Sequence, residues 1–529
     1  MNKIKKLIAM LLVLLMAVSM LGACGKSEGS NEGTKDPGND VAEDITGAAD
    51  DTQDVEEPED MAEITLMVMS LGAMGDGKDA VEEGINAITE KEINTHVTLQ
   101  YVEVGSYSQQ LNLAITGNEK VDICLTTPIP ASSFSALIAQ NQLMPLNDLL
   151  PKYAPEALAE VGEYIKGTTI NGNIYAIPNY RNLATSYYII ARKDIIDDLG
   201  LADAFNNMAS WSDYEKILEA IKGKGGISPI ANNDVDGNII CFPNGNLDTD
   251  SFAGFTTFDN LGDGYKLIGV DADGKVINNF ASPQYKAMIE RVRSWYEKGY
   301  VYKDAATTDQ ASENLMKANV TASFVKMGEL GVETAVKGTS GYDVVIKKLA
   351  TPLISTGNTT KFDWAIPVCA TEPEAAAKFL NLMFTNKDIC NLLAWGVEGR
   401  DYVVENGVAK YPEGVTADTV AYHTSDFLYG NQFLVYPWEG DPADIRDQQL
   451  AELKSAEISP YLGFSCDLTN ISNELTAINN VIGEYKPGVE SGSVDLKAYD
   501  AFVKKLNEAG AEKVVAEYQA QLDAWKAQQ

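Results

Sequence analysis

The sequence predicts an α/β protein with two lobes, and three observations lead to this fold. Between residues 63 and 127, runs with the alternating pattern of strands are separated by runs with helical periodicity, at the spacing of β-α-β units. Two aliphatic segments that each contain a proline lie at 171–201 and 362–370, and the first is too long and too apolar for a surface loop. The chain is also too long for a single hydrophobic core. We therefore expect two lobes that are connected twice.

The individual elements follow from their patterns in order. In the first lobe we expect strands at 63–70, 96–104 and 121–127 and helices at 78–93 and 106–118. Farther along, helices should open at the capping sequences of residues 212–215, 282–283 and 371–374, with strands at 318–329 and 342–349. The apolar residues Val514, Tyr518, Leu522 and Trp525 predict one amphipathic helix at the end of the chain.

The first sixty residues predict export and tethering. Lysines precede an apolar stretch at 7–21, which is too short to span a bilayer comfortably. The sequence LGAC at 21–24 resembles the bacterial lipobox, and this resemblance implies a diacylglyceryl group on the Cys24 thiol and cleavage before it. The alternative is an ordinary signal peptide with an incidental cysteine. The acidic tract that follows has few apolar residues, so we expect a disordered linker as far as residue 61.

Composition and motifs argue against several classes of function. The formal net charge of −35 argues against nucleic acid and anionic lipid as partners. The two histidines lack metal-ligand spacing, and no Walker, GxSxG or GxGxxG motif follows a predicted strand, so we expect no metal, no cofactor and no catalytic site. The sequences at 234–238 and 271–275 predict Asp-Gly turns rather than calcium loops. Glycoside hydrolysis needs only two facing carboxylates, so that alternative stays open.

The order of several segments resembles a known family. These are QNQLMPLNDLLPKYAP (140–155), GNIYAIPNY (172–180), a helix opened by WSDYE, and FDWAIPV followed by EPEAAAKFLNLM. Together they resemble the extracellular solute-binding lipoproteins of sugar ABC importers, and the part from WGVEGRDYVV (395–404) onward resembles the LipO/LplA-like subgroup with its extra C-terminal region. The resemblance covers essentially the whole chain after residue 61.

The resemblance implies a two-lobe, periplasmic-binding-protein-like fold of type II, with a hinge, an additional helical C-terminal region and ligand held between the lobes. It implies a monomer that is lipid-anchored on the extracellular face of the cell membrane of a Gram-positive type bacterium. Its partners would be a carbohydrate, preferably an oligosaccharide, and the transmembrane subunits of an ABC permease. A surface-anchored glycoside hydrolase and a peptide-binding or sensory lipoprotein are the alternatives.

Domain boundaries can be assigned on this basis. We expect a lipoprotein signal peptide at 1–23, a linker at 24–61, a first lobe from 62–178 and 318–365, a second lobe from 179–317 and 366–395, and a C-terminal region at 396–529 that packs on the lobes.

Sugar binding requires aromatic rings that pack on C–H faces and polar side chains that bond hydroxyls. The candidate ligand-binding residues are Tyr107, Thr127, Asn179, Tyr180, Arg181, Glu329, Trp395, Glu398, Arg400, His423 and Trp438. Arg181 stands alone in an uncharged stretch, so it is expected to bind either a sugar hydroxyl or a carboxylate between the lobes. Glu398 and Arg400 alternatively pair with each other, and Trp395 is as compatible with the core as with a cleft.

Some conspicuous residues are more compatible with the core than with a site. Trp211, Trp295 and Trp364 lie in or beside apolar runs, which predicts buried positions. Cys124 and Cys369 lie in apolar strand-like runs, which predicts buried free thiols.

Overall fold

The first of two main sheets has five strands in the order β2-β1-β3-β13-β6. The computed structural model describes residues 60–71, 75–233, 249–253, 258–349 and 353–529, so the expected signal peptide and nearly all of the expected linker lie outside the described residues. The strands of this sheet are β1 (Ala62–Ser70), β2 (Thr95–Glu103), β3 (Ile123–Leu125), β13 (Asp363–Ala365) and β6 (Ile177–Pro178). The first three are parallel as predicted, whereas β13 runs antiparallel to both of its neighbours, so the sheet is mixed.

Helices cover this sheet and bury their apolar side chains against those of its strands. The helix α2 (Lys78–Ile93) ends where Asn94 takes the left-handed conformation, with φ of 50°, which lets the chain turn back into β2. The remaining helices and strands of this part are α3 (Val104–Gly117), α4 (Phe134–Ala139), α5 (Leu149–Tyr153), α6 (Pro155–Val161), β4 (Thr169–Ile170), β5 (Asn173–Ile174), α14 (Pro373–Thr385) and α15 (Lys387–Trp395). The hydrophobic core between them includes Trp364, Phe379 and Trp395.

The second main sheet has three antiparallel strands in the order β10-β7-β11. These are β10 (Ser323–Gly328), β7 (Ser186–Arg192) and β11 (Val344–Lys348). The other elements of this part are α7 (Lys193–Asp198), α8 (Ala202–Asn207), α9 (Trp211–Lys224), β8 (Ile268–Val270), β9 (Val276–Asn278), α10 (Pro283–Glu297), α11 (Ser312–Lys317) and α12 (Val332–Ser340). The predicted Asp-Gly turn at 271–275 joins β8 to β9 as a hairpin, with the Asp271 amide donating to the Lys275 carbonyl at 3.0 Å.

These pairings correct the expected domain boundaries. Residues 318–365 were expected wholly in the first lobe, but β10 and β11 pair with β7 of the second sheet. Residues 366–395 were expected in the second lobe, but α14 and α15 pack into the core of the first sheet. The hydrophobic patterns of these segments predict strands and helices but not the sheet to which they belong. That depends on contacts with elements far away in the sequence.

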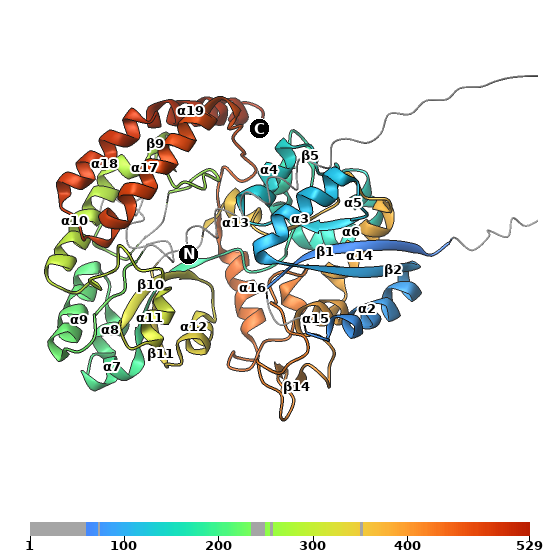
Figure 1. The fold of residues 1–529 in the computed structure, drawn as a ribbon, viewed down its shortest axis with the longest axis horizontal. Helices are drawn as coiled ribbons and strands as arrows, with labels where there is room; N and C mark the ends of the chain where they lie inside the picture. The colour runs from blue at the N-terminus through green and yellow to red at the C-terminus, as the bar shows by residue number, and fades with distance from the viewer. Residues whose placement is uncertain (1–59, 72–74, 234–248, 254–257, 350–352) are drawn as a thin grey trace, which may run out of the picture. The chain divides into compact units, whose positions relative to one another are not determined.

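The C-terminal helices form a layer on the second part of the chain. They are α17 (Ser472–Ser491), α18 (Leu496–Glu508) and α19 (Ala511–Lys526), and Figure 1 shows them in red, with α17 and α18 beside α10. Phe502, Val514 and Leu522 are fully buried in the same core as Val292 and Trp295 of α10. The region is therefore part of the core of the second lobe. The closing helix predicted from Val514, Tyr518, Leu522 and Trp525 is α19, and Gly510, with φ of 103°, separates it from α18.

Three segments pass between the two parts, one more than predicted, and the predicted crossing at 362–370 is not one of them, because its β13 pairs within the first sheet. The first is the connection from β6 to β7, the second contains β12 (Leu353–Ile354) and α13 (Thr356–Thr359), and the third contains α16 (Ile445–Ser455) and β16 (Glu457–Ile458). β12 and β16 pair in parallel. Leu183, Ile354 and Leu453, one from each segment, form a small separate apolar cluster. Each connection is thereby packed against the other two.

The capping sequences predicted the exact start of one helix out of the three that follow. Ser282 caps α10 as predicted, and its side chain accepts from the Tyr285 amide. α9 begins two residues earlier than predicted, because Ser210 rather than Ser212 caps it by accepting from the Asp213 amide. At α14 the N-cap is Glu372, and its side chain makes no capping hydrogen bond. The described cysteines at 124, 369, 390 and 466 are free, and the first two are buried as expected.

Candidate functional site

A cluster of charged side chains lies where the chain passes between the two sheets, and we call Arg181, Glu329, Lys361 and Asp363 the polar cluster. Arg181 follows β6 on the first connection, Glu329 follows β10 of the second sheet, and Asp363 begins β13 of the first sheet. Arg181 interacts electrostatically with both carboxylates. The polar cluster therefore joins groups from both sheets.

The polar cluster has more hydrogen-bonding groups than the protein satisfies. The Asp363 side chain is fully buried, and its Oδ2 accepts from the Thr126 hydroxyl at 2.8 Å while its Oδ1 has no partner among the described residues. The buried Glu329 Oε2 likewise has no partner there. Unsatisfied buried acceptors cost about 1–3 kcal/mol each, so they point to a missing polar partner.

Burial changes the pKa of each member of the polar cluster. It raises the pKa of Asp363 well above its usual value and, with the nearby Asp426 charge, raises the pKa of Glu329 to about 7. Burial lowers the pKa of Arg181, against the opposing effect of Glu329. Burial and the Arg181 charge lower the pKa of Lys361 to about 8. Hydrogen bonds from a ligand would offset part of the free-energy cost of this desolvation.

Asp426 and Arg446 form the wall next to the polar cluster. Arg446 of α16 donates to Asp426, to the Val435 carbonyl at 3.1 Å and to Gln449 Oε1 at 2.9 Å. Gln449 in turn donates to the Leu330 carbonyl at 3.0 Å, directly after Glu329. This network fixes α16 against the loop that follows β10.

Further unsatisfied polar atoms lie around the same wall. Tyr188 Oη, His423 Nδ1, Ser425 Oγ and Asp441 Oδ1 are buried and have no hydrogen-bond partner among the described residues. Tyr188 interacts electrostatically with Glu329, and His423 and Asp441 interact with Asp426. Most buried polar groups in native proteins have partners, so this local excess indicates a site for a polar molecule.

Four aromatic rings gather beside this wall, and we call Trp395, Tyr411, His423 and Trp438 the aromatic cluster. The His423 ring stacks on Trp395 with centroids 4.8 Å apart and an interplanar angle of 23°. Trp438 meets His423 edge-on at 4.4 Å, and Tyr411 meets Trp438 edge-on at 4.9 Å. Burial lowers the pKa of His423 to about 4, so the ring is neutral at pH 7.

The aromatic cluster lies beyond the carboxyl end of β1. Gly77 directly precedes α2, its amide donates to the Ala421 carbonyl at 3.2 Å, and its carbonyl accepts from Arg400 at 3.1 Å. His423 follows two residues after Ala421. Ligands of open α/β sheets bind at this edge.

The structure brings five of the predicted residues into these clusters and gives others a packing role. Arg181 and Glu329 are in the polar cluster, and Trp395, His423 and Trp438 are in the aromatic cluster. Tyr107 is fully buried, and its hydroxyl donates to the Leu125 carbonyl at 2.7 Å. Thr127 is also fully buried, and its hydroxyl lies 2.5 Å from that of Ser132.

The other predicted residues are used in local contacts. Asn179 Oδ1 accepts from Trp364 Nε1 and from the Gly430 amide, both at 2.8 Å. The Tyr180 ring packs edge-on against Phe433 with centroids 5.0 Å apart. Arg400 pairs with Asp401 at 2.5 Å rather than with Glu398, which is exposed.

Sequence reasoning missed Lys361, Asp363, Tyr411 and Asp426. Asp363 does carry a signal, since it is a lone carboxylate inside an aliphatic strand. The other three lie in polar segments of ordinary composition, where no pattern distinguishes them.

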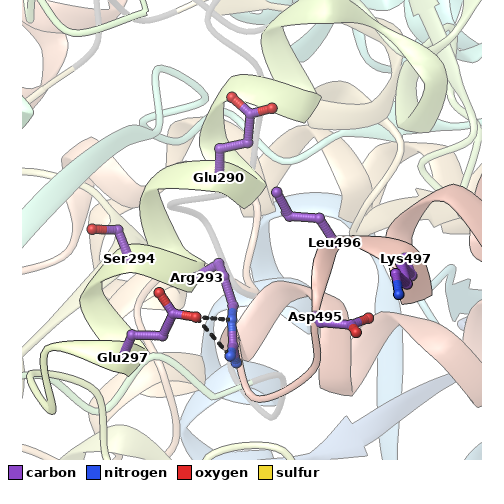
Figure 2. A pocket seen from close by; sticks show the side chains of 7 residues that line it. All are labelled: Glu290, Arg293, Ser294, Glu297, Asp495, Leu496 and Lys497. Carbon is purple, nitrogen blue, oxygen red and sulfur yellow. Dashed lines mark hydrogen bonds and ion pairs between the residues drawn. The ribbon is translucent and has the colours of Figure 1, made fainter.

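A surface pocket lies elsewhere, between α10 and the start of α18 (Figure 2). It is lined by Glu290, Arg293, Ser294, Glu297, Asp495, Leu496 and Lys497. Arg293 pairs with Glu297 at 2.8 Å and donates to the Gly492 carbonyl at 2.9 Å. These contacts attach the C-terminal helices to α10, and the pocket shares no residue with either cluster.

Replacing Glu329 with glutamine should make stability less dependent on pH. An acid whose pKa is raised to about 7 binds more protons in the native than in the unfolded state, so native stability falls as pH rises from about 4.5 to 7. We expect wild-type protein to lose about 2 kcal/mol of unfolding free energy relative to Glu329→Gln between pH 5 and 8, measured by urea denaturation. The exposed Glu413→Gln is the control, and equal pH profiles for wild type and Glu329→Gln would contradict the burial of this charge.

Comparisons with known proteins agree with this fold. Residues 85–395 match the model of a family described as bacterial extracellular solute-binding protein, and residues 460–527 match a domain of unknown function (DUF3502). A carbohydrate ABC transporter substrate-binding protein of Streptococcus pneumoniae serotype 4 (strain ATCC BAA-334 / TIGR4) is 26% identical over 475 residues, covering 86% of this chain and 90% of that protein. Lipoprotein LipO of Bacillus subtilis (strain 168) is 24% identical over 346 residues, covering 60% of this chain and 64% of that protein.

A solved structure resembles most of the chain. The N-glycan transport solute binding protein (NgtS) from Streptococcus pneumoniae aligns with a TM-score of 0.74 at 23% identity, covering 88% of this chain and 98% of that one. The two-lobe fold expected from the sequence is therefore confirmed. In the part of the chain that the structure describes, no helix has the length and apolar character needed to cross a membrane, and no group of His, Cys, Asp and Glu side chains could hold a metal ion.

Proposed function

Because this chain belongs to the family of bacterial extracellular solute-binding proteins, we propose that it is the substrate-binding component of an ABC importer and that it captures a carbohydrate between its lobes. The observation that carries this proposal is the group of buried polar atoms without partners at the polar cluster, next to the aromatic cluster. Sugar hydroxyls both donate and accept hydrogen bonds, so they can satisfy Arg181 together with Asp363 Oδ1 and Glu329 Oε2. The C–H face of a sugar ring packs on aromatic rings.

The relatives support a carbohydrate as the ligand class. One curated relative is named a carbohydrate ABC transporter substrate-binding protein, and another a fructooligosaccharide ABC transporter substrate-binding protein, FusA. NgtS has been solved in complex with Man1GlcNAc and with Man5GlcNAc. We propose that this chain, too, binds an oligosaccharide and presents it to a pair of permease subunits.

A thermal-shift screen tests the proposal. Purified protein is mixed with neutral mono- and oligosaccharides and, as a comparison class, with short peptides. At least one saccharide should raise the melting temperature saturably, by the increment expected from RT ln(1 + [L]/Kd). Stabilisation by peptides together with no response to any saccharide would favour a peptide receptor instead.

The same sugars separate a receptor from a glycoside hydrolase. A receptor returns its ligand unchanged, whereas a hydrolase with two carboxylates at a cleft releases shorter products. We propose that this chain does not turn over its ligand. Incubating each stabilising oligosaccharide with excess protein and analysing it by mass spectrometry should recover the intact compound, and shorter products would overturn this assignment.

We also propose that a lipid on Cys24 tethers the protein, although Cys24 lies outside the described residues. Two acyl chains are needed for stable anchoring, and a diacylglyceryl group supplies them. Cys24→Ala should abolish incorporation of labelled palmitate and shift the protein from the membrane fraction to the medium or to an unprocessed form. Normal labelling of the variant would contradict the assignment of Cys24, and Cys466→Ala is the matched control.

A further inference from the structure

The polar cluster and the aromatic cluster are linked by the segment 423–426. Asp426 interacts electrostatically with Arg181 and Glu329 of the polar cluster and with His423 of the aromatic cluster. Ser425 and His423 precede it in the same segment, and both have a buried polar atom without a partner among the described residues. The two clusters therefore adjoin through residues 423–426.

The two clusters differ in what they offer a ligand. The polar cluster is deep, since Asp363 is fully buried and Arg181 is 8% exposed. Its charged groups can form hydrogen bonds with the hydroxyls of one sugar ring. In the aromatic cluster, Tyr411 and Trp438 are half-buried, so each keeps part of its ring at the surface.

The aromatic cluster is supported from within. Trp395 is 4% exposed, and its Nε1 donates to the Tyr436 carbonyl at 3.0 Å, so this ring is held in the core. His423 stacks on it, and Tyr411 and Trp438 pack against His423 with centroids 5.5 and 4.4 Å apart. Among the described residues, neither the Tyr411 hydroxyl nor Trp438 Nε1 has a hydrogen-bond partner. The outer rings are thus fixed in position while their polar atoms stay available.

The aromatic cluster also adjoins the second lobe. Asp441 follows Trp438 by three residues, and Thr334 of α12 donates to the Gly440 carbonyl at 3.2 Å. A ring that rests on Tyr411 and Trp438 would therefore lie near the rim where the two lobes meet.

We propose that the site binds a ligand of at least two linked sugar rings, one in the polar cluster and the next against Tyr411 and Trp438, so that these two side chains select for ligand length. This inference rests on the proposed carbohydrate-binding function and adds where the second ring lies. It predicts that Arg181 acts on every ligand, whereas Tyr411 and Trp438 act only on ligands with more than one ring.

Calorimetry with homologous saccharides tests the inference. The probes are one-, two- and four-ring members of the chito-, malto-, manno- and fructo-oligosaccharide series. The variants are Tyr411→Leu and Trp438→Leu, which keep an apolar side chain but remove the aromatic ring, and Trp525→Ala on α19 is the aromatic control. Melting temperatures and circular dichroism establish that each variant is folded.

In the series that binds, wild type should bind the two-ring member at least tenfold more tightly than the single ring. Tyr411→Leu and Trp438→Leu should each weaken binding of the two- and four-ring ligands about tenfold and change the single-ring affinity less than twofold. Trp525→Ala should bind every ligand with the affinity of wild type. Equal weakening of one- and two-ring ligands, or no weakening, would overturn the length selection while leaving sugar binding intact. No binding across all four series would instead overturn the proposed function, and this inference with it.

Discussion

Replacing Arg181 with methionine should weaken saccharide binding at least 100-fold. The side chain is almost fully buried and interacts with the carboxylates of Glu329, Asp363 and Asp426. Methionine has a similar length but no charge and no donors, so the variant leaves buried carboxylates without their cation and removes the donors offered to the ligand. Loss of one member of a buried charged pair costs about 2–5 kcal/mol, and about 1.4 kcal/mol corresponds to a tenfold change in affinity.

The measurement is isothermal titration calorimetry with the saccharide that gives the largest thermal shift. Arg181→Lys keeps the charge but not the planar fork, so it should recover only part of the affinity. Arg293→Met is the matched control, because Arg293 is a partly buried arginine at the pocket of Figure 2 and not at the polar cluster. If Arg181→Met binds within threefold of wild type, Arg181 is a structural cation between the lobes and the ligand lies elsewhere.

Arg181 also illustrates how much of a site can be predicted from one sequence. A lone arginine in an uncharged stretch is unusual, and that contrast singled it out. Its partners come from β13 and from segments far away in the chain, and they meet only through the folding of both sheets. The aromatic cluster shows the same limit: Trp395, His423 and Trp438 were candidates as rare residue types, whereas Tyr411 resembles any other tyrosine until the contacts are known.

For the fold, too, features that depend on local contacts could be predicted, whereas features that depend on distant contacts could not. The strands β1 to β3 and the helices between them have clear periodicity and neighbours close in sequence, so their type and parallel order could be predicted. β10 and β11 were predicted as strands, but their pairing with β7 depends on contacts across more than a hundred residues. The third connection through α16 lacks the proline-containing aliphatic pattern that marked the first.

Replacing Trp364 with alanine should have the largest effect on stability. Trp364 is fully buried in β13, and its ring stacks near Tyr429 with centroids 6.2 Å apart. Its Nε1 donates to Asn179 Oδ1 at 2.8 Å and to the Leu428 carbonyl at 3.0 Å. The residue therefore connects β13, the segment after β6 and the 428–430 loop, all of which border the polar cluster.

Truncation of a buried tryptophan to alanine costs about 3–5 kcal/mol, through lost apolar burial and the cavity that remains. Trp364→Phe keeps most of the apolar contact but removes the N–H group, so it should cost about 1–3 kcal/mol. Urea denaturation followed by circular dichroism measures both free energies, with an unchanged m-value expected if the denatured state is unaffected.

A less buried tryptophan supplies the control for this prediction. Trp525 near the end of α19 is half-buried and meets Phe464 edge-on at 6.0 Å, so Trp525→Ala should cost less than Trp364→Phe. Because Asn179 Oδ1 also accepts from the Gly430 amide, Trp364→Phe should leave the 428–430 loop in place and saccharide affinity within about threefold of wild type. A loss of affinity as large as that of Arg181→Met, in a variant that stays folded, would show that Trp364 positions the polar cluster as well as the core.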